Sequence, residues 1–231
     1  MRLTSSLSIL FLLFTIPMIG QEFQSSDYEI ASKEKSIIRQ YEGQDLIGFF
    51  RNFEYKKGKI DKVIITDLKK NKIVIFSEDI KYMYLPMAES IFNRGTRSYE
   101  PITEDTSFIR NDKTKYLYFE NTRIIEGNNE TWSLLQLISD MEANKIRVYT
   151  DPNAKPNESH TNILGFEVTD LTPNSYFIKK GDHPAFVVEK SKYKKAFNNI
   201  YGDCPSILQN FTKRRWNEIE EHVNHYNQKC D

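Results

Sequence analysis

The chain has 231 residues, of which 39% are hydrophobic and 28% charged, and at about 150 residues per domain it is long enough for one domain, at most two. Its 32 basic residues balance 32 acidic ones, so it lacks the basic excess that is typical of nucleic-acid-binding proteins. With 15 Phe and 13 Tyr against 8 Pro, it is too aromatic and too neutral to be intrinsically disordered.

The first twenty residues have the pattern of a secretory signal peptide. Arg2 supplies positive charge, an apolar run extends from Leu7 to Ile16, and Pro17 ends it ahead of a suitable cleavage site at Gly20-Gln21. Because the run is short for a membrane span, an uncleaved anchor is the less favoured alternative. We expect residues 1–20 to be removed, and residues 21–231 to reach the periplasm or the medium as one α+β domain with no transmembrane segment.

The first half of the mature chain has the pattern of an antiparallel sheet, preceded by one helix. Asp27 can cap a helix over 27–41, because its apolar residues recur at helical spacing. Apolar and aromatic stretches separated by turn residues predict strands at 46–53, 58–66, 72–77 and 80–85, and one or two further strands over 116–125. The polar stretch 87–114 predicts a loop with one short helix near 88–92.

The middle of the chain predicts a central helix with further strands. Thr131 can cap a helix that ends at Asn144, since the residues between them give it one broad apolar face: Leu134, Leu135, Leu137, Ile138 and Met141. A strand at 145–149, an exposed loop at 151–160, a strand at 163–169 and a hairpin of 175–180 with 184–189 follow.

The C-terminal residues are predicted to be helical. Amphipathic helices begin at Tyr193, Pro205 and Trp216, and the first of them ends at Gly202. The predicted fold is therefore α+β, with a β-rich part at 43–126, a mixed part at 127–189 and a C-terminal helical hairpin at 190–231.

Cys204 and Cys230 are the two cysteines of the chain, and in an exported protein they most simply form a disulfide. Two antiparallel helices of the predicted lengths would bring both cysteines to the same end of the hairpin. Free thiols, or a zinc site completed by His222 and His225, are the alternatives, but the cysteines lack the close pairing of zinc ligands.

The remaining candidate residues each have a plain structural explanation beside the functional one. His222 and His225, preceded by Glu218 and Glu221, could form a metal-binding helix face, but a solvated face with local ion pairs is the commoner case. The basic runs 190–195 and 213–215 could meet an anionic surface, or be the solvated faces of helices.

Motifs for catalysis and cofactor binding are missing from the sequence. It contains no Gly-x-Ser-x-Gly motif, no His-Glu-x-x-His motif and no glycine-rich phosphate loop. His160 lies in the predicted loop and His183 in the predicted hairpin turn, with no evident nucleophile for either. We therefore assign no catalytic, cofactor-binding or metal-ligating residue, and no cofactor.

Several short motifs resemble a group of uncharacterised exported proteins of Bacteroidota-type bacteria. The similar segments are the leader end at 19–21, the strands around 58–60, 73–76 and 79–80, the stretch 134–149, the hairpin at 176–179, Asp203-Cys204-Pro205, and Tyr226-Asn227 with Cys230. Because that group has no assigned activity, the resemblance implies export and no particular reaction.

The sequence thus favours a non-enzymatic binding or assembly protein of the cell envelope, with an unknown envelope or extracellular partner. The alternative is a secreted hydrolase that acts on an envelope or extracellular polymer through two carboxylates distant in sequence.

Overall fold

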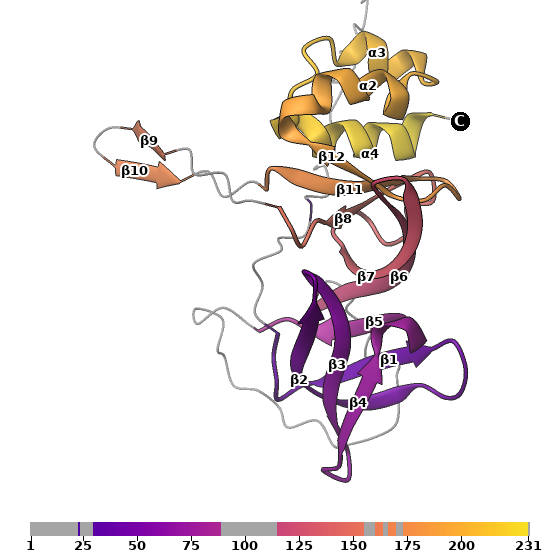
Figure 1. The fold of residues 1–231 in the computed structure, drawn as a ribbon. Helices are drawn as coiled ribbons and strands as arrows, with labels where there is room; N and C mark the ends of the chain where they lie inside the picture. Colours follow the sequence, from indigo (N-terminus) through magenta and orange to yellow (C-terminus); the bar gives the residue numbers. More distant parts are fainter. Residues whose placement is uncertain are drawn as a thin grey trace, which may run out of the picture.

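The computed structural model of the chain describes residues 23, 30–88, 115–154, 160–163, 166–169 and 173–230. Their main element is a ten-stranded antiparallel sheet in the order β12-β11-β8-β7-β6-β5-β1-β2-β3-β4. In Figure 1, β1 to β5 lie below the long β6–β7 hairpin, and three helices cover the strands above it. The chain is therefore an α+β protein with a helical C-terminal part, as the sequence predicted.

The first five strands curl into a small, partly open barrel. They are β1 (Lys35–Gln40), β2 (Leu46–Lys56), β3 (Lys59–Asp67), β4 (Lys72–Phe76) and β5 (Ile80–Pro86), with the 3-10 turn η1 (Ser77–Asp79) before β5. β5 pairs with β1, placing Ile37 opposite Tyr84, and β3 turns back to contact β7. The curl buries an apolar cluster that includes Ile38, Val63, Ile65, Ile80, Met83 and Leu85.

The next five strands of the sheet form a second curled unit. They are β6 (Tyr116–Glu126), β7 (Asn129–Leu137), β8 (Ile146–Thr150), β11 (Ser175–Lys180) and β12 (Phe186–Glu189). Just before β12, Ala185 accepts a hydrogen bond from the Ile125 amide and donates one to the Arg123 carbonyl, each 2.8 Å long, and so closes the unit back onto β6. A separate hairpin, β9 (His160–Ile163) and β10 (Phe166–Thr169), precedes β11.

Three helices form a helical cap over the outer face of β8, β11 and β12 (Figure 1). They are α2 (Tyr193–Tyr201), α3 (Pro205–Asn210) and α4 (Ile219–Lys229), with 3-10 turns η4 (Lys190–Lys192) and η5 (Trp216–Glu218) before α2 and α4. Alternate strand residues such as Val148 and Ile178 face the cap, whereas Tyr149 and Phe177 face the interior of the second unit. No helix in the described ranges is both long enough and apolar enough to span a membrane.

Covalent and polar contacts fasten the cap to the sheet. The predicted disulfide between Cys204 and Cys230 is present, with a Cα–Cα distance of 5.5 Å. The Asn227 side chain of α4 accepts a hydrogen bond from the Ile146 amide at 2.8 Å and donates one to the Ile146 carbonyl at 2.9 Å. The Lys180 ammonium donates to Asp203, which also accepts a hydrogen bond from the Tyr226 hydroxyl.

The predicted central helix over 131–144 is wrong, because this stretch contains strand β7. β7 pairs with β6 from Asn129 to Leu137 and lies between two cores. Leu134 packs in the cluster of the first unit, whereas Leu135 and Leu137 pack in that of the second. A strand with apolar neighbours on both faces loses the period-two alternation, and its run of leucines then resembles a helix face.

Two further predictions differ from the structure. The predicted helix over 27–41 is replaced by strand β1, in which Ile37 and Ile38 are buried; β-branched residues suit a strand flanked by partners on both edges. The single strand predicted at 163–169 is instead the β9–β10 hairpin, so His160 begins a strand. The short helix near 88–92 falls almost entirely outside the described residues.

The hairpin turn between β2 and β3 packs against the second unit at Gly58. Gly58 has φ +76°, and a Cβ there would lie 2.3 Å from Asn153 Oδ1. Gly58→Ala should therefore cost about 1–2 kcal/mol for the left-handed backbone, plus the displacement of Asn153. Gly127→Ala is the matched control in urea unfolding, because Gly127 has φ +62° with nothing within 4 Å of its Cβ position. Equal losses of unfolding free energy in the two variants would show that the Gly58–Asn153 packing contributes nothing to stability.

Candidate functional site

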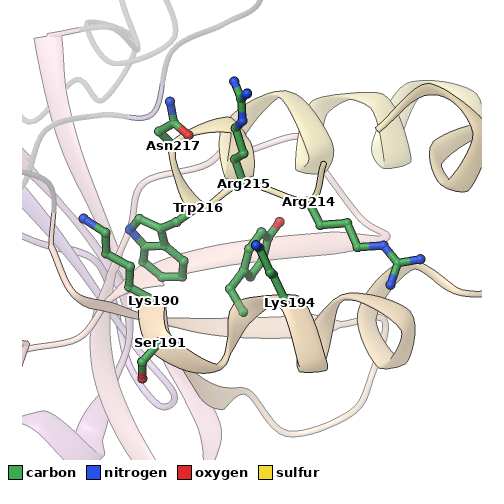
Figure 2. Close-up of a pocket in the computed structure, with 8 residues that line it drawn as sticks. Lys190, Ser191, Lys194, Arg214, Arg215, Trp216 and Asn217 are labelled. Carbon is green, nitrogen blue, oxygen red and sulfur yellow. The ribbon is translucent and has the colours of Figure 1, made fainter. Parts of the chain in front are cut away.

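The two basic runs of the sequence meet on the helical cap and line one pocket. The pocket has a volume of about 610 Å³ and lies between the start of α2 and the linker that precedes α4 (Figure 2). Its lining residues are Lys190, Ser191, Tyr193, Lys194, Arg214, Arg215, Trp216 and Asn217. The basic runs are therefore more than two separate solvated helix faces.

Two buried aromatic residues form the base of this basic pocket. The rings of Tyr193 and Trp216 meet edge to face, with centroids 5.4 Å apart. Trp216 also stacks on Tyr176 of β11 and donates its indole N–H to the Pro173 carbonyl at 3.1 Å. Because both rings are fixed by packing and hydrogen bonding, the base of the pocket is preorganised.

Two cations around this base, Lys194 and Arg214, form no ion pair with another residue that the structure describes. Lys194 is exposed. The Arg215 guanidinium lies 3.4 Å from the Glu218 carboxylate, and Arg214 lies over the Phe197 ring at 5.1 Å. In Figure 2 the two guanidinium groups point outward at the rim, while Lys194 lies in the opening between the walls.

Lysines are concentrated at the start of α2, where acidic residues are the usual choice. Four lysines, Lys190, Lys192, Lys194 and Lys195, lie in η4 and the first turn of α2. The first turns of η4 and α2 contain no acidic residue, and α2 has no side-chain cap. A helix N-terminus carries partial positive charge, which repels nearby lysine side chains. A bound anion would interact favourably with both the helix N-terminus and the lysines. Lys192 forms an ion pair with Glu189 at 2.7 Å.

A buried histidine lies directly behind the base of the pocket. His222 is completely inaccessible, and its Nδ1 lies 2.6 Å from the Tyr193 hydroxyl. Its Nε2 has no hydrogen-bond partner and lies 3.8 Å from the Glu218 carboxylate. Burial among aromatic rings lowers the pKa of His222 to about 4, with a smaller contribution from His225. His222 is therefore neutral at physiological pH and helps to hold Tyr193 in place.

This burial corrects the solvated face predicted for the two histidines. On α4, His222 points into the core, and His225 is half-buried with Nε2 2.9 Å from the Ser206 hydroxyl. In the ranges that the structure describes, no three His, Cys, Asp or Glu side chains are grouped so as to hold a metal ion. His183 lies in the hairpin turn, as predicted.

A second polar cluster lies in the second unit, around Glu120 of β6. Its carboxylate accepts hydrogen bonds from the Arg147 guanidinium at 2.7 and 2.8 Å, from the Tyr149 hydroxyl, and from the Tyr118 hydroxyl at 3.3 Å. Burial raises the pKa of both tyrosines. Because the carboxylate is shared among three donors, this cluster is best explained as a structural tie between β6 and β8.

Sequence reasoning did not connect the two basic runs, nor did it identify Trp216 as part of a site. The runs are separated by α3 and become neighbours only when the helices pack. The available signal was the concentration of lysines at the start of a predicted helix with no acidic residue in its first turn. Helices usually have acidic residues in the first turn and basic residues in the last. Comparisons with protein-family models, curated proteins and solved structures find no match to this chain, so the proposal for this pocket depends on its geometry.

Proposed function

We propose that the chain is an exported, non-enzymatic binding protein of the cell envelope, which uses the basic pocket to hold an anionic group of an envelope or extracellular partner. The observation that carries this proposal is the concentration of four basic side chains, Lys190, Lys194, Arg214 and Arg215, around one pocket of a chain whose formal net charge is zero. Residues 190–215 contain seven Lys and Arg residues and one carboxylate, Asp203, which is already paired with Lys180.

Two features support export. The N-terminal pattern is that of a signal peptide, and the two cysteines are joined in a disulfide. Disulfides persist in oxidising compartments and are rare in the reducing cytosol.

The composition of the pocket supports binding rather than hydrolysis. The described residues that line it include no carboxylate and no imidazole, the usual general bases of a hydrolase. Lysine and arginine side chains over an aromatic base can instead pair with an anion and pack against an apolar or planar portion of the same ligand.

Calorimetric titration with inorganic pyrophosphate, a compact polyvalent anion, tests the pocket. We expect saturable binding that weakens as salt is added, because the attraction is largely electrostatic. The double variant Lys194→Gln/Arg214→Gln should weaken the affinity about tenfold or more, equivalent to about 1.4 kcal/mol, since it removes two charge-assisted contacts.

The matched control removes the same amount of charge elsewhere on the cap. Lys192→Gln/Lys229→Gln changes one lysine paired with Glu189 and one at the far end of α4, neither of which lines the pocket. Equal affinity losses in both double variants would mean that net charge, and not the pocket, attracts the anion. No binding by the unmodified protein at low salt would contradict the proposal.

A further inference from the structure

The sheet has one edge that nothing in the described structure covers. Its order ends at β12 on one side and β4 on the other. At the β12 end, Ala185 returns to pair with β6. β4 pairs with β3 along one edge, and its second edge has no partner strand among the described residues. Such an edge presents unpaired backbone N–H and C=O groups and can pair with another strand.

β4 is also unusually apolar for an exposed edge strand. Its sequence is Lys72-Ile-Val-Ile-Phe76, with Ile75 buried in the barrel core. On the outer face, Val74 is 44% and Phe76 48% exposed. An apolar edge strand whose outer residues are exposed is typical of a sheet that is completed by a strand from a partner.

The charges at the two ends of β4 are of opposite sign. Lys69, Lys70 and Lys72 are exposed at its start, whereas Glu78 and Asp79 are exposed just after its end. Two copies of β4 paired antiparallel about Val74 would place Lys72 opposite Phe76 and bring the lysine end of each copy to the acidic end of the other. Parallel pairing would place like charges together, so this pattern favours antiparallel pairing of two identical strands.

We infer that β4 is a self-association edge, through which two copies of the chain form a dimer with two-fold symmetry. The pairing would join the two sheets into one continuous sheet, with Val74 of each copy on the symmetry axis. Because the described ten-stranded sheet has one such edge, pairing through β4 about a two-fold axis closes at two copies and does not propagate. β4 and the basic pocket lie at opposite ends of the sheet order, and Figure 1 shows β4 far from the helical cap, so both pockets stay accessible in the dimer. This inference does not depend on the function of the pocket.

Sedimentation velocity of the disulfide-bonded mature protein over a wide dilution series tests the inference. We expect a monomer–dimer equilibrium that shifts to monomer on dilution and at high salt, because a five-residue strand pairing is a small interface. Val74→Lys should abolish the dimer, since it places two ammonium groups opposite each other on the axis. Val187→Lys is the matched control, because Val187 is 41% exposed on β12 at the other end of the sheet, and it should leave the dimer unchanged.

Charge reversal distinguishes antiparallel pairing from general apolar association. Lys69→Glu/Lys70→Glu should weaken the dimer at least tenfold, because it brings acidic groups to the acidic end of the partner. Adding Glu78→Lys/Asp79→Lys to the same chain exchanges the two ends and should restore the association. A protein that remains monomeric at its highest soluble concentration would overturn the inference, as would a dimer that survives Val74→Lys or a charge exchange that fails to restore pairing.

Discussion

Cys204→Ser should lower the free energy of unfolding by about 3.5 kcal/mol, because the disulfide spans 26 residues and its loss releases that loop in the unfolded chain. The effect should be concentrated in the helical cap. α3 has six residues and α4 eleven, lengths that are marginal for helices without tertiary support. Hydrogen exchange should therefore show faster opening of the α3 and α4 amides, while the first five strands keep their protection.

Two results would contradict this account of the disulfide. Thiol titration of the wild-type protein, unfolded without a reducing agent, should find no free cysteine. Two reactive thiols would show that the bridge does not form. An equal loss of protection in the cap and in the first barrel would show that the cap is not a separate unit of stability. The contacts of Asn227 and Asp203 with the sheet remain in the variant, so we expect a loosened cap and not an unfolded one.

Acidification should destabilise the protein through His222. Its pKa lies at about 4 in the folded chain, below the ordinary value of 6.5, so the unfolded chain binds a proton that the folded chain does not. The neutral His222 contributes about 3 kcal/mol to the free energy of unfolding. This contribution is fully present above pH 6.5 and is lost as the pH falls through the folded pKa. The titratable groups that face the imidazole are Tyr193, Tyr201, Glu218 on the preceding turn and His225.

The variant His222→Gln isolates this contribution, because an amide can hydrogen-bond to Tyr193 but does not titrate. Urea unfolding at about pH 7 and about pH 4.5 measures the drop in unfolding free energy between the two pH values. This drop should be roughly 2–3 kcal/mol larger for the wild type than for the variant. His225→Gln is the matched control on the same helix, since His225 is only half-buried and contacts Ser206. An identical pH dependence in the wild type and in His222→Gln would show that His222 is not the group responsible.

Strands β2 to β5 of the first barrel were predictable from apolar stretches bounded by turn residues, whereas β1 was predicted as a helix. In β5, Ile80, Met83 and Leu85 are buried, and Pro86 ends the stretch, so apolar content and turn residues together place the strand. The helices α2 and α4 of the cap were predictable because their apolar residues recur at helical spacing and form one buried face. β7 was not, because it lies between two cores and its pattern does not distinguish a doubly buried strand from a helix.

The candidate site was only partly predictable, because its parts meet through helix packing. The disulfide could be anticipated from two cysteines at the two ends of one helical segment. The burial of His222 could not, because α4 is covered on that side by Tyr193, Phe197 and Phe211, which come from other segments of the cap. The pocket likewise depends on the packing of the 213–215 linker against the start of α2.

The central claim, that the basic pocket holds an anion, is tested most directly by following the two tryptophan indole resonances in a proton–nitrogen NMR spectrum during titration with inorganic pyrophosphate. Trp216 lines the pocket, whereas Trp132 is 57% exposed on β7 and does not line it, so the chain contains its own control. We predict a saturable shift of the Trp216 indole resonance, with a midpoint that moves to an about tenfold or more higher pyrophosphate concentration in Lys194→Gln/Arg214→Gln, and an unchanged Trp132 resonance. If neither resonance moves, or if both move together without saturating, the basic pocket is not an anion-binding site.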